Sequence, residues 1–149
     1  MPAAGSHIPL ILAFLDRIGI TVTAEPLSDT FLPGLTVRRG TLVYDPERLV
    51  WPGDLLHEAG HIAVSDPAVR NDDTGVSADP GEEMAAMAWS YAAALEIGMD
   101  PAIVFHSGGY LGGGANFMES YRRKPGIGVP MLQWFEMTED FPVMTRWLR

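Results

Sequence analysis

Apolar and polar residues alternate along the first third of the chain in patterns that predict one helix followed by three strands. Ile8 to Ile18 has apolar residues at helical spacing and ends before a glycine, which favours an amphipathic helix. Ile20 to Glu25 alternates and contains β-branched residues, as strands do. Two further strands are predicted over Leu35–Arg38 and Thr41–Tyr44, joined by a tight turn at Arg39-Gly40.

The middle of the chain predicts two longer helices with recognisable ends. The first begins at Asp54, whose carboxylate is suited to accept from the free amides of the first turn, and runs to about Ser65. The second begins at Asp79-Pro80, where a capping residue precedes a proline at the first helical position, and runs to about Ile97. Alanines crowd the middle of this second helix, so a neighbouring helix can pack closely against it.

The order of these elements predicts an α+β fold. The last third adds expected helices over Pro101–Phe105, Asn116–Tyr121 and Pro130–Met137. One helix, then three strands, then several helices is a segregated order, unlike the alternation of a doubly wound parallel sheet. A length of 149 residues fits a single domain over residues 1–149. We expect large apolar residues to fill its core, namely Trp89, Trp134, Trp147, Phe135, Phe141 and Met137.

Composition narrows the functions that this chain can have. The formal net charge of −9 disfavours nucleic acid as a direct partner, because an acidic surface repels phosphates. The absence of cysteine excludes disulfides and thiolate metal ligands, which leaves His, Asp and Glu as metal donors. No apolar segment is long enough to cross a membrane, and no basic region precedes the first helix. We therefore expect no membrane association and a cytoplasmic location.

The sequence His57-Glu58-Ala59-Gly60-His61 carries the clearest chemical signal. Histidines four residues apart on a helix lie on one face, one turn apart, where both can bind one ion. Zinc accepts imidazole nitrogens at about 2.0–2.1 Å. Glu58 follows directly and is placed to take a proton from a water molecule activated by the zinc. These residue types in this order indicate a zinc hydrolase.

A catalytic zinc ion needs a third protein ligand, and no further histidine follows at a suitable spacing. The start of the second long helix offers two carboxylates, Glu82 and Glu83. Glu82 is suited to a capping-box arrangement with Asp79, which leaves Glu83 as the better ligand candidate. A first-turn carboxylate that binds no metal is stabilised by the helix dipole in any case, so the residues alone leave both candidates open.

The two motifs together resemble those of the gluzincins, zinc peptidases with a His-Glu-x-x-His motif and a glutamate on a later helix. The ImmA/IrrE-like and mini-gluzincin peptidases are similar in size and carry His-Glu-x-Gly-His followed by Glu-x-x-Ala-x-x-aromatic-small. Residues Glu83 to Ser90 match this second pattern, with Trp89 at the aromatic position. The resemblance covers roughly Leu35 to Leu95 and implies a zincin-like fold, with Zn²⁺ bound by His57, His61 and Glu83.

A zinc hydrolase also needs a donor that stabilises the oxyanion of the tetrahedral intermediate. Enzymes of the resembling families use a histidine or a tyrosine for this purpose. His106 and Tyr110 flank a glycine-rich segment and are the catalytic candidates, whereas Tyr91 is better interpreted as a core residue. Alternatively, His106 is an ordinary loop histidine and Tyr110 a half-buried tyrosine without a catalytic role.

Three functions remain open at the level of sequence. The first is a zinc-dependent metallopeptidase that acts on a peptide or protein substrate, with Glu58 as general base. The second is a metal-binding zincin-like domain with a regulatory protein partner and little peptidase activity, which the ImmA/IrrE resemblance and the short chain suggest. The third is a structural helical domain in which the motif occurs by chance.

Overall fold

The computed structural model describes residues 7–72, 79–109, 112–123 and 126–149. An N-terminal helix precedes a small sheet, and helices make up most of the remainder, as the sequence predicts for an α+β fold. The elements are α1 (His7–Ile18), β1 (Val22–Ala24), β2 (Leu35–Arg38), β3 (Thr41–Tyr44), α2 (Asp54–Val64), α3 (Pro80–Glu96), η2 (Pro101–Ile103), α4 (Gly114–Arg122), α5 (Val129–Trp134), β4 (Thr138–Asp140) and β5 (Val143–Met144).

The three N-terminal strands form a mixed sheet in the order β1-β3-β2. β1 runs parallel to β3, and β2 pairs antiparallel with β3 through the expected tight turn. Arg39 and Gly40 both have positive φ, 51° and 75°, which is the backbone of a type I′ hairpin turn. This order places β2 at the edge of the sheet, next to α2.

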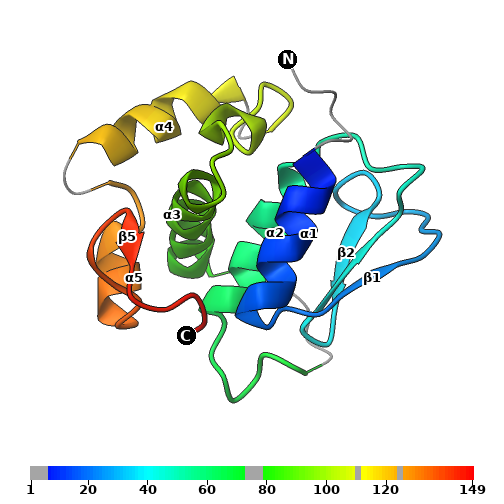
Figure 1. Cartoon of the computed structure of the whole chain (residues 1–149), viewed down its shortest axis with the longest axis horizontal. Coiled ribbons are helices and arrows are strands. Elements are labelled where there is room, and N and C mark those ends of the chain that lie inside the picture. Colours follow the sequence, from blue (N-terminus) through cyan, green and yellow to red (C-terminus); the bar gives the residue numbers. More distant parts are fainter. Residues whose placement is uncertain (1–6, 73–78, 110–111, 124–125) are drawn as a thin grey trace.

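Helix α2 lies at the centre of the molecule (Figure 1). The sheet contacts one side of this helix and α3 packs against another, while α4 and α5 lie beyond α3. Small residues allow the close contact between α2 and α3, because Gly60 of α2 lies against Ala86 of α3 and both are buried. The alanine-rich middle of α3 therefore serves the close helix contact that the sequence predicts.

Gly60 is the point of closest approach between the two helices. A Cβ added there would lie 2.7 Å from the carbonyl oxygen of Ala86 and 3.2 Å from the Trp89 ring. No real Cβ approaches backbone this closely, so any side chain at position 60 would push α3 away. A glycine inside a helix costs about 1 kcal/mol relative to alanine, and here it permits the helix contact.

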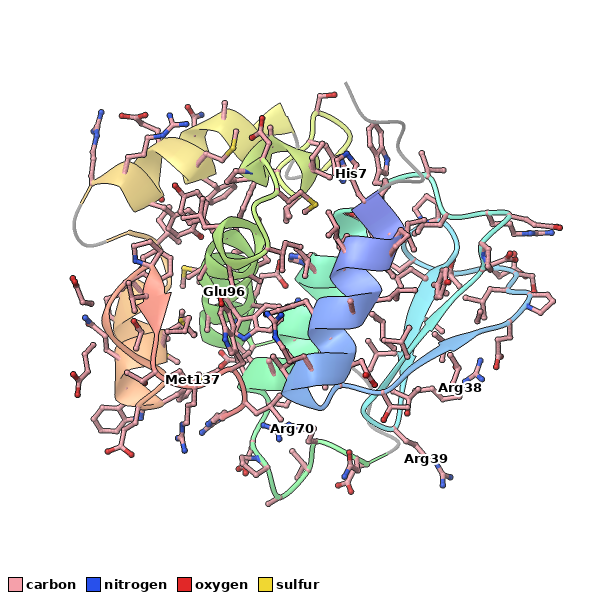
Figure 2. The ribbon with its side chains drawn as sticks, in the orientation of Figure 1. His7, Arg38, Arg39, Arg70, Glu96 and Met137 are labelled. Atoms are coloured by element: carbon pink, nitrogen blue, oxygen red, sulfur yellow. The ribbon has the colours of Figure 1, made fainter. Side chains whose placement is uncertain are left out.

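The C-terminal end of α2 is fixed by Arg70, which follows it closely in sequence, and by Arg149, which is distant in sequence. The Arg70 side chain donates to the carbonyl oxygens of Ile62, Ala63 and Ser65 and also binds the Arg149 oxygen. Arg149 in turn donates from its backbone nitrogen to Ala63 at 2.9 Å. Figure 2 shows Arg70 beside this end of the helix. These donors satisfy carbonyls that a helix end leaves unpaired.

The C-terminal third corrects two expectations. The predicted helix over Pro130–Met137 ends at Trp134, and the following residues form a small antiparallel hairpin of β4 and β5, which the pattern did not predict. Trp134 was expected in the core, but its exposed fraction is 80%. Trp89 is fully buried, and its indole nitrogen donates to the Trp147 oxygen at 2.9 Å.

No helix among the described residues has the length and apolar character needed to span a bilayer.

Replacing Gly60 with alanine should destabilise the protein, although alanine is the better helix former. We expect a net loss of up to about 2 kcal/mol, because overpacking costs about 1–3 kcal/mol and helix propensity returns about 1 kcal/mol. Urea unfolding measures this change. Gly81→Ala is the matched control, since a Cβ there makes only ordinary contact, at 3.4 Å from Met131. Equal stability of the two variants would contradict this account of the helix contact.

Candidate metal centre

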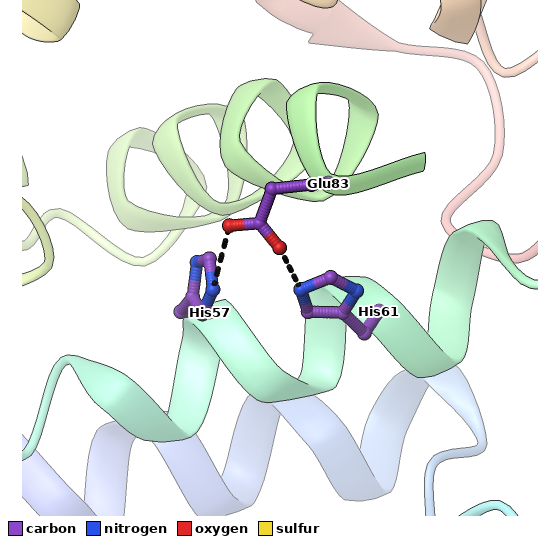
Figure 3. A group of neighbouring side chains, drawn as sticks. All are labelled: His57, His61 and Glu83. Carbon is purple, nitrogen blue, oxygen red and sulfur yellow. Dashed lines mark ion pairs between the residues drawn. The ribbon is translucent and has the colours of Figure 1, made fainter. Parts of the chain in front are cut away.

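His57, His61 and Glu83 converge between α2 and α3 (Figure 3). The two histidines project from successive turns of α2, and Glu83 reaches them from the first turn of α3. Glu83 Oε1 lies 3.3 Å from His57 Nε2, and Glu83 Oε2 lies 2.6 Å from His61 Nε2. One ligand atom from each of the three residues lies within 4.8 Å of the others.

The local sequence explains why Glu83 and not Glu82 faces the histidines. The Asp79 side chain caps α3 by accepting from the Gly81 amide, and Pro80 begins the helix, which fixes the position of the first turn. Successive residues on a helix point about 100° apart. Glu82 therefore points elsewhere, and its carboxylate accepts from the Ser65 hydroxyl at 3.3 Å. The geometry thus favours Glu83 as the carboxylate of this group.

The group fits a zinc ion by its donor chemistry and by its burial. Two imidazole nitrogens and one carboxylate oxygen form the set that catalytic zinc sites use, and a zinc ion keeps a fourth position for water or substrate. The His61 side chain is only 3% exposed, whereas Glu83 is 44% exposed. The histidine side is thus closed by protein and the carboxylate side is open, as a site with a free position requires.

Charge is concentrated on these residues in the metal-free protein. Hydrogen bonds from His57 and His61 hold the pKa of Glu83 far below its ordinary value of 4.5. Burial lowers the pKa of His57, but the hydrogen bond to Glu83 and the charges of Glu58 and Glu83 outweigh it and leave the pKa raised. In the absence of a metal ion, the protonated His57 imidazole and the Glu83 carboxylate therefore stabilise one another.

Glu58 lies beside the group without being part of it. Its Oε1 is 3.8 Å from His57 Nε2, and its side chain is mostly buried. Burial raises the pKa of Glu58, partly offset by the neighbouring histidines. A carboxylate that is buried next to a candidate zinc site is suited to accept a proton from water near neutral pH.

A cleft of about 430 Å³ opens onto these four residues. Its other wall comes from β2 and the segment before it. The described residues that line the cleft are Phe31, Leu32, Leu35, Thr36, Val37, His57, Glu58, His61 and Glu83. One wall is therefore polar and carries the candidate chemistry, while the opposite wall is largely apolar.

His106 has a different environment from the one expected of an oxyanion donor. Its Nε2 lies 2.7 Å from Asp54 Oδ1, and its ring stacks on Trp51 with centroids 4.1 Å apart. Its Nδ1 accepts from the Gly108 amide at 3.2 Å. Both ring nitrogens thus have partners, and His106 is not among the described residues lining the cleft. Its catalytic role stays a prediction, and it would require His106 to release Asp54.

This contact also corrects the expected role of Asp54. The residue was expected to cap α2, but Gly53 occupies the cap position and no side chain makes the cap hydrogen bond. Asp54 is the first residue of the helix and is buried, which raises the pKa of its carboxyl despite the hydrogen bond with His106. The Asp54–His106 pair joins the start of α2 to the segment that follows η2.

The two tyrosines considered as donors have different outcomes. Tyr110 lies outside the described residues, so its role stays a prediction. Tyr91 is 8% exposed and packs against Tyr121 and Phe141, which agrees with its interpretation as a core residue.

Tyr121 was not singled out from the sequence, since no motif marks it. Its buried hydroxyl has no hydrogen-bond partner among the described residues, and burial together with the charge of Glu83 raises its pKa.

Zinc should bind at this group and stabilise the fold. A ligand that binds only the native state adds about 2.7 kcal/mol to the free energy of unfolding when its concentration is 100 times its Kd. The unfolding temperature should therefore rise when zinc is added and fall back when a chelator removes it. Glu83→Gln should weaken zinc affinity at least tenfold, as measured by titration calorimetry. Glu82→Gln makes the same charge change one residue away and should leave the affinity unchanged. A larger effect from Glu82→Gln would assign the ligand to that residue.

The metal-free protein should show a pH-dependent contribution from the His57–Glu83 pair. The lowered pKa of Glu83 adds stability to the folded state that is fully present above pH 4.5. This stability is lost as the pH falls through the pKa that Glu83 has in the folded protein. The raised pKa of His57 adds stability to the folded state that is fully present below pH 6.5. This stability is lost as the pH rises through the pKa that His57 has in the folded protein. The stability difference between wild type and Glu83→Gln should therefore peak between pH 4.5 and 6.5. Thermal unfolding in chelator measures it, and a flat difference would refute the pairing.

Comparisons with protein-family models, curated proteins and solved structures give no match to this chain. The assignment of the candidate site therefore rests on its own residues. Those residues form a His57, His61 and Glu83 group on adjacent helices, with the geometry that a His-Glu-x-x-His motif and a later helical glutamate require.

Proposed function

We propose that this protein is a zinc-dependent metallopeptidase of the gluzincin type. The observation that carries the proposal is the convergence of His57, His61 and Glu83, with Glu58 beside them at the same cleft. The resemblance of the two helical motifs to gluzincins supports the same function. Two imidazoles and a carboxylate favour zinc over magnesium or calcium, which prefer oxygen ligands.

Each residue has a distinct part in the proposed hydrolysis. Zinc, when bound, supplies the Lewis acidity that polarises a carbonyl group and acidifies a water molecule. Glu58 removes a proton from the attacking water as its oxygen bonds to the carbonyl carbon of the peptide. Glu58 then delivers this proton to the leaving nitrogen as the C–N bond breaks. His57, His61 and Glu83 hold the metal, and the packing of α2 on α3 fixes their positions.

The position of β2 supports a peptide as the substrate. β2 is an edge strand whose residues line the cleft together with Glu58. Apart from a bridge between Leu32 and Leu35, no described strand pairs with its outer edge. An edge strand offers unpaired backbone N–H and C=O groups, with which an extended peptide can form a further strand. A peptide bound in this way would pass the zinc ligands.

Glu58→Gln should abolish peptide hydrolysis while retaining zinc. Loss of a general base lowers the rate about 10²- to 10⁴-fold, and glutamine keeps the shape of the side chain. Cleavage of a mixed peptide library by the zinc-loaded protein, followed by mass spectrometry, measures activity, and calorimetry measures zinc affinity. Glu82→Gln is the control for loss of an acidic side chain outside the cleft and should retain activity.

The outcomes separate the three functions. Activity that is unchanged in Glu58→Gln would refute the proposed mechanism. Tight zinc binding without cleavage of any peptide would favour the metal-binding domain with a regulatory protein partner. A protein whose unfolding responds neither to zinc nor to a chelator would leave only a structural domain with a chance motif.

A further inference from the structure

We infer that the apolar wall of the cleft selects substrates with a large aliphatic or aromatic side chain next to the scissile bond, and that Phe31 is its main determinant. This inference rests on the proposed peptidase function. Phe31 and Leu32 lie in the segment before β2, and Leu35 and Val37 belong to β2 itself. All four line the same cleft as Glu58 and the three candidate zinc ligands.

Phe31 is a large apolar residue that the fold leaves exposed. Its side chain is 100% exposed, whereas Leu35 nearby is 2% exposed and forms part of the core. Phe31 therefore contributes no burial to the fold. Burying a phenylalanine side chain contributes about 1.5–3 kcal/mol, and for Phe31 this contribution becomes available only when another molecule covers it. Because Phe31 lines the same cleft as the candidate zinc ligands, a substrate bound in that cleft is the molecule that would cover it.

Charge at the cleft selects in the same direction. Glu58 and Glu83 form part of the opposite wall, and none of the described lining residues is a lysine or an arginine. Arg38, which follows the lining residue Val37, is paired with Glu25 at 2.8 Å. An acidic side chain in the cleft would lose hydration without gaining a cationic partner. The cleft therefore favours apolar side chains over acidic ones.

Side-chain preference measured in matched peptides tests this inference. Fluorogenic peptides that carry leucine, alanine or glutamate at the positions flanking the cleaved bond are compared by kcat/KM. Wild type should prefer leucine, and Phe31→Ala should reduce the leucine-over-alanine preference about tenfold, since one apolar contact discriminates by about 10- to 200-fold. Phe31→Leu should keep most of the preference. Trp134→Ala removes another exposed aromatic that does not line the cleft and should change nothing.

A binding measurement separates failure of this inference from failure of the proposed function. The same peptides, labelled and added to zinc-loaded Glu58→Gln protein, report affinity by fluorescence anisotropy without cleavage. Weaker binding of the leucine peptide after Phe31→Ala supports the apolar wall even if wild type cleaves nothing. Cleavage or binding with no preference for leucine, or with the same preference in Phe31→Ala, overturns the inference. The peptidase proposal depends separately on whether the zinc-loaded wild type cleaves peptides. Circular dichroism and zinc affinity confirm that each variant is folded.

Discussion

The close contact of α2 with α3 at Gly60 and Ala86 determines whether the candidate site can exist. A Cβ at position 60 would lie 2.7 Å from the Ala86 oxygen, so only glycine allows this spacing. Glu83 is less than one helical turn before Ala86, and its carboxylate reaches both histidines only because the helices lie this close. The same glycine lowers the intrinsic helix stability of α2. Packing thus outweighs local propensity at the residue between the two candidate ligands.

The rest of the fold holds α2 at both ends. The Asp54–His106 pair fixes its first turn, and the side chains of Arg70 and Arg149 satisfy carbonyls in its last turn. The His106 and Arg149 contacts come from segments far away in sequence, so they fix α2 relative to the segment after η2 and to the C-terminus. A site whose ligands lie on one fixed helix and on its closest neighbour is preorganised, which favours metal binding and oriented catalysis.

The cleft combines two surfaces with different physical roles. The wall from α2 and α3 carries ionisable groups that could hold an ion and accept a proton, whereas the wall from β2, an edge strand, is largely apolar. Polar groups that converge beside an apolar surface are typical of small-molecule and peptide sites. If the proposed function holds, the short sheet has a role beyond packing, because its edge strand lines the cleft that also contains the candidate zinc ligands.

The sequence by itself determined the local elements and the chemical type of the site. The spacing of His57 and His61, the cap at Asp79 and the turn at Arg39-Gly40 depend on neighbouring residues, so the pattern predicts them. The sequence pattern did not predict contacts between residues that are distant in sequence. The sequence favoured Glu83 over Glu82, and the tertiary structure placed Glu83 beside the two histidines. Only the tertiary structure paired Asp54 with His106, exposed Trp134 and formed the β4–β5 hairpin. These features depend on which surfaces meet after folding, and hydrophobic periodicity does not encode that.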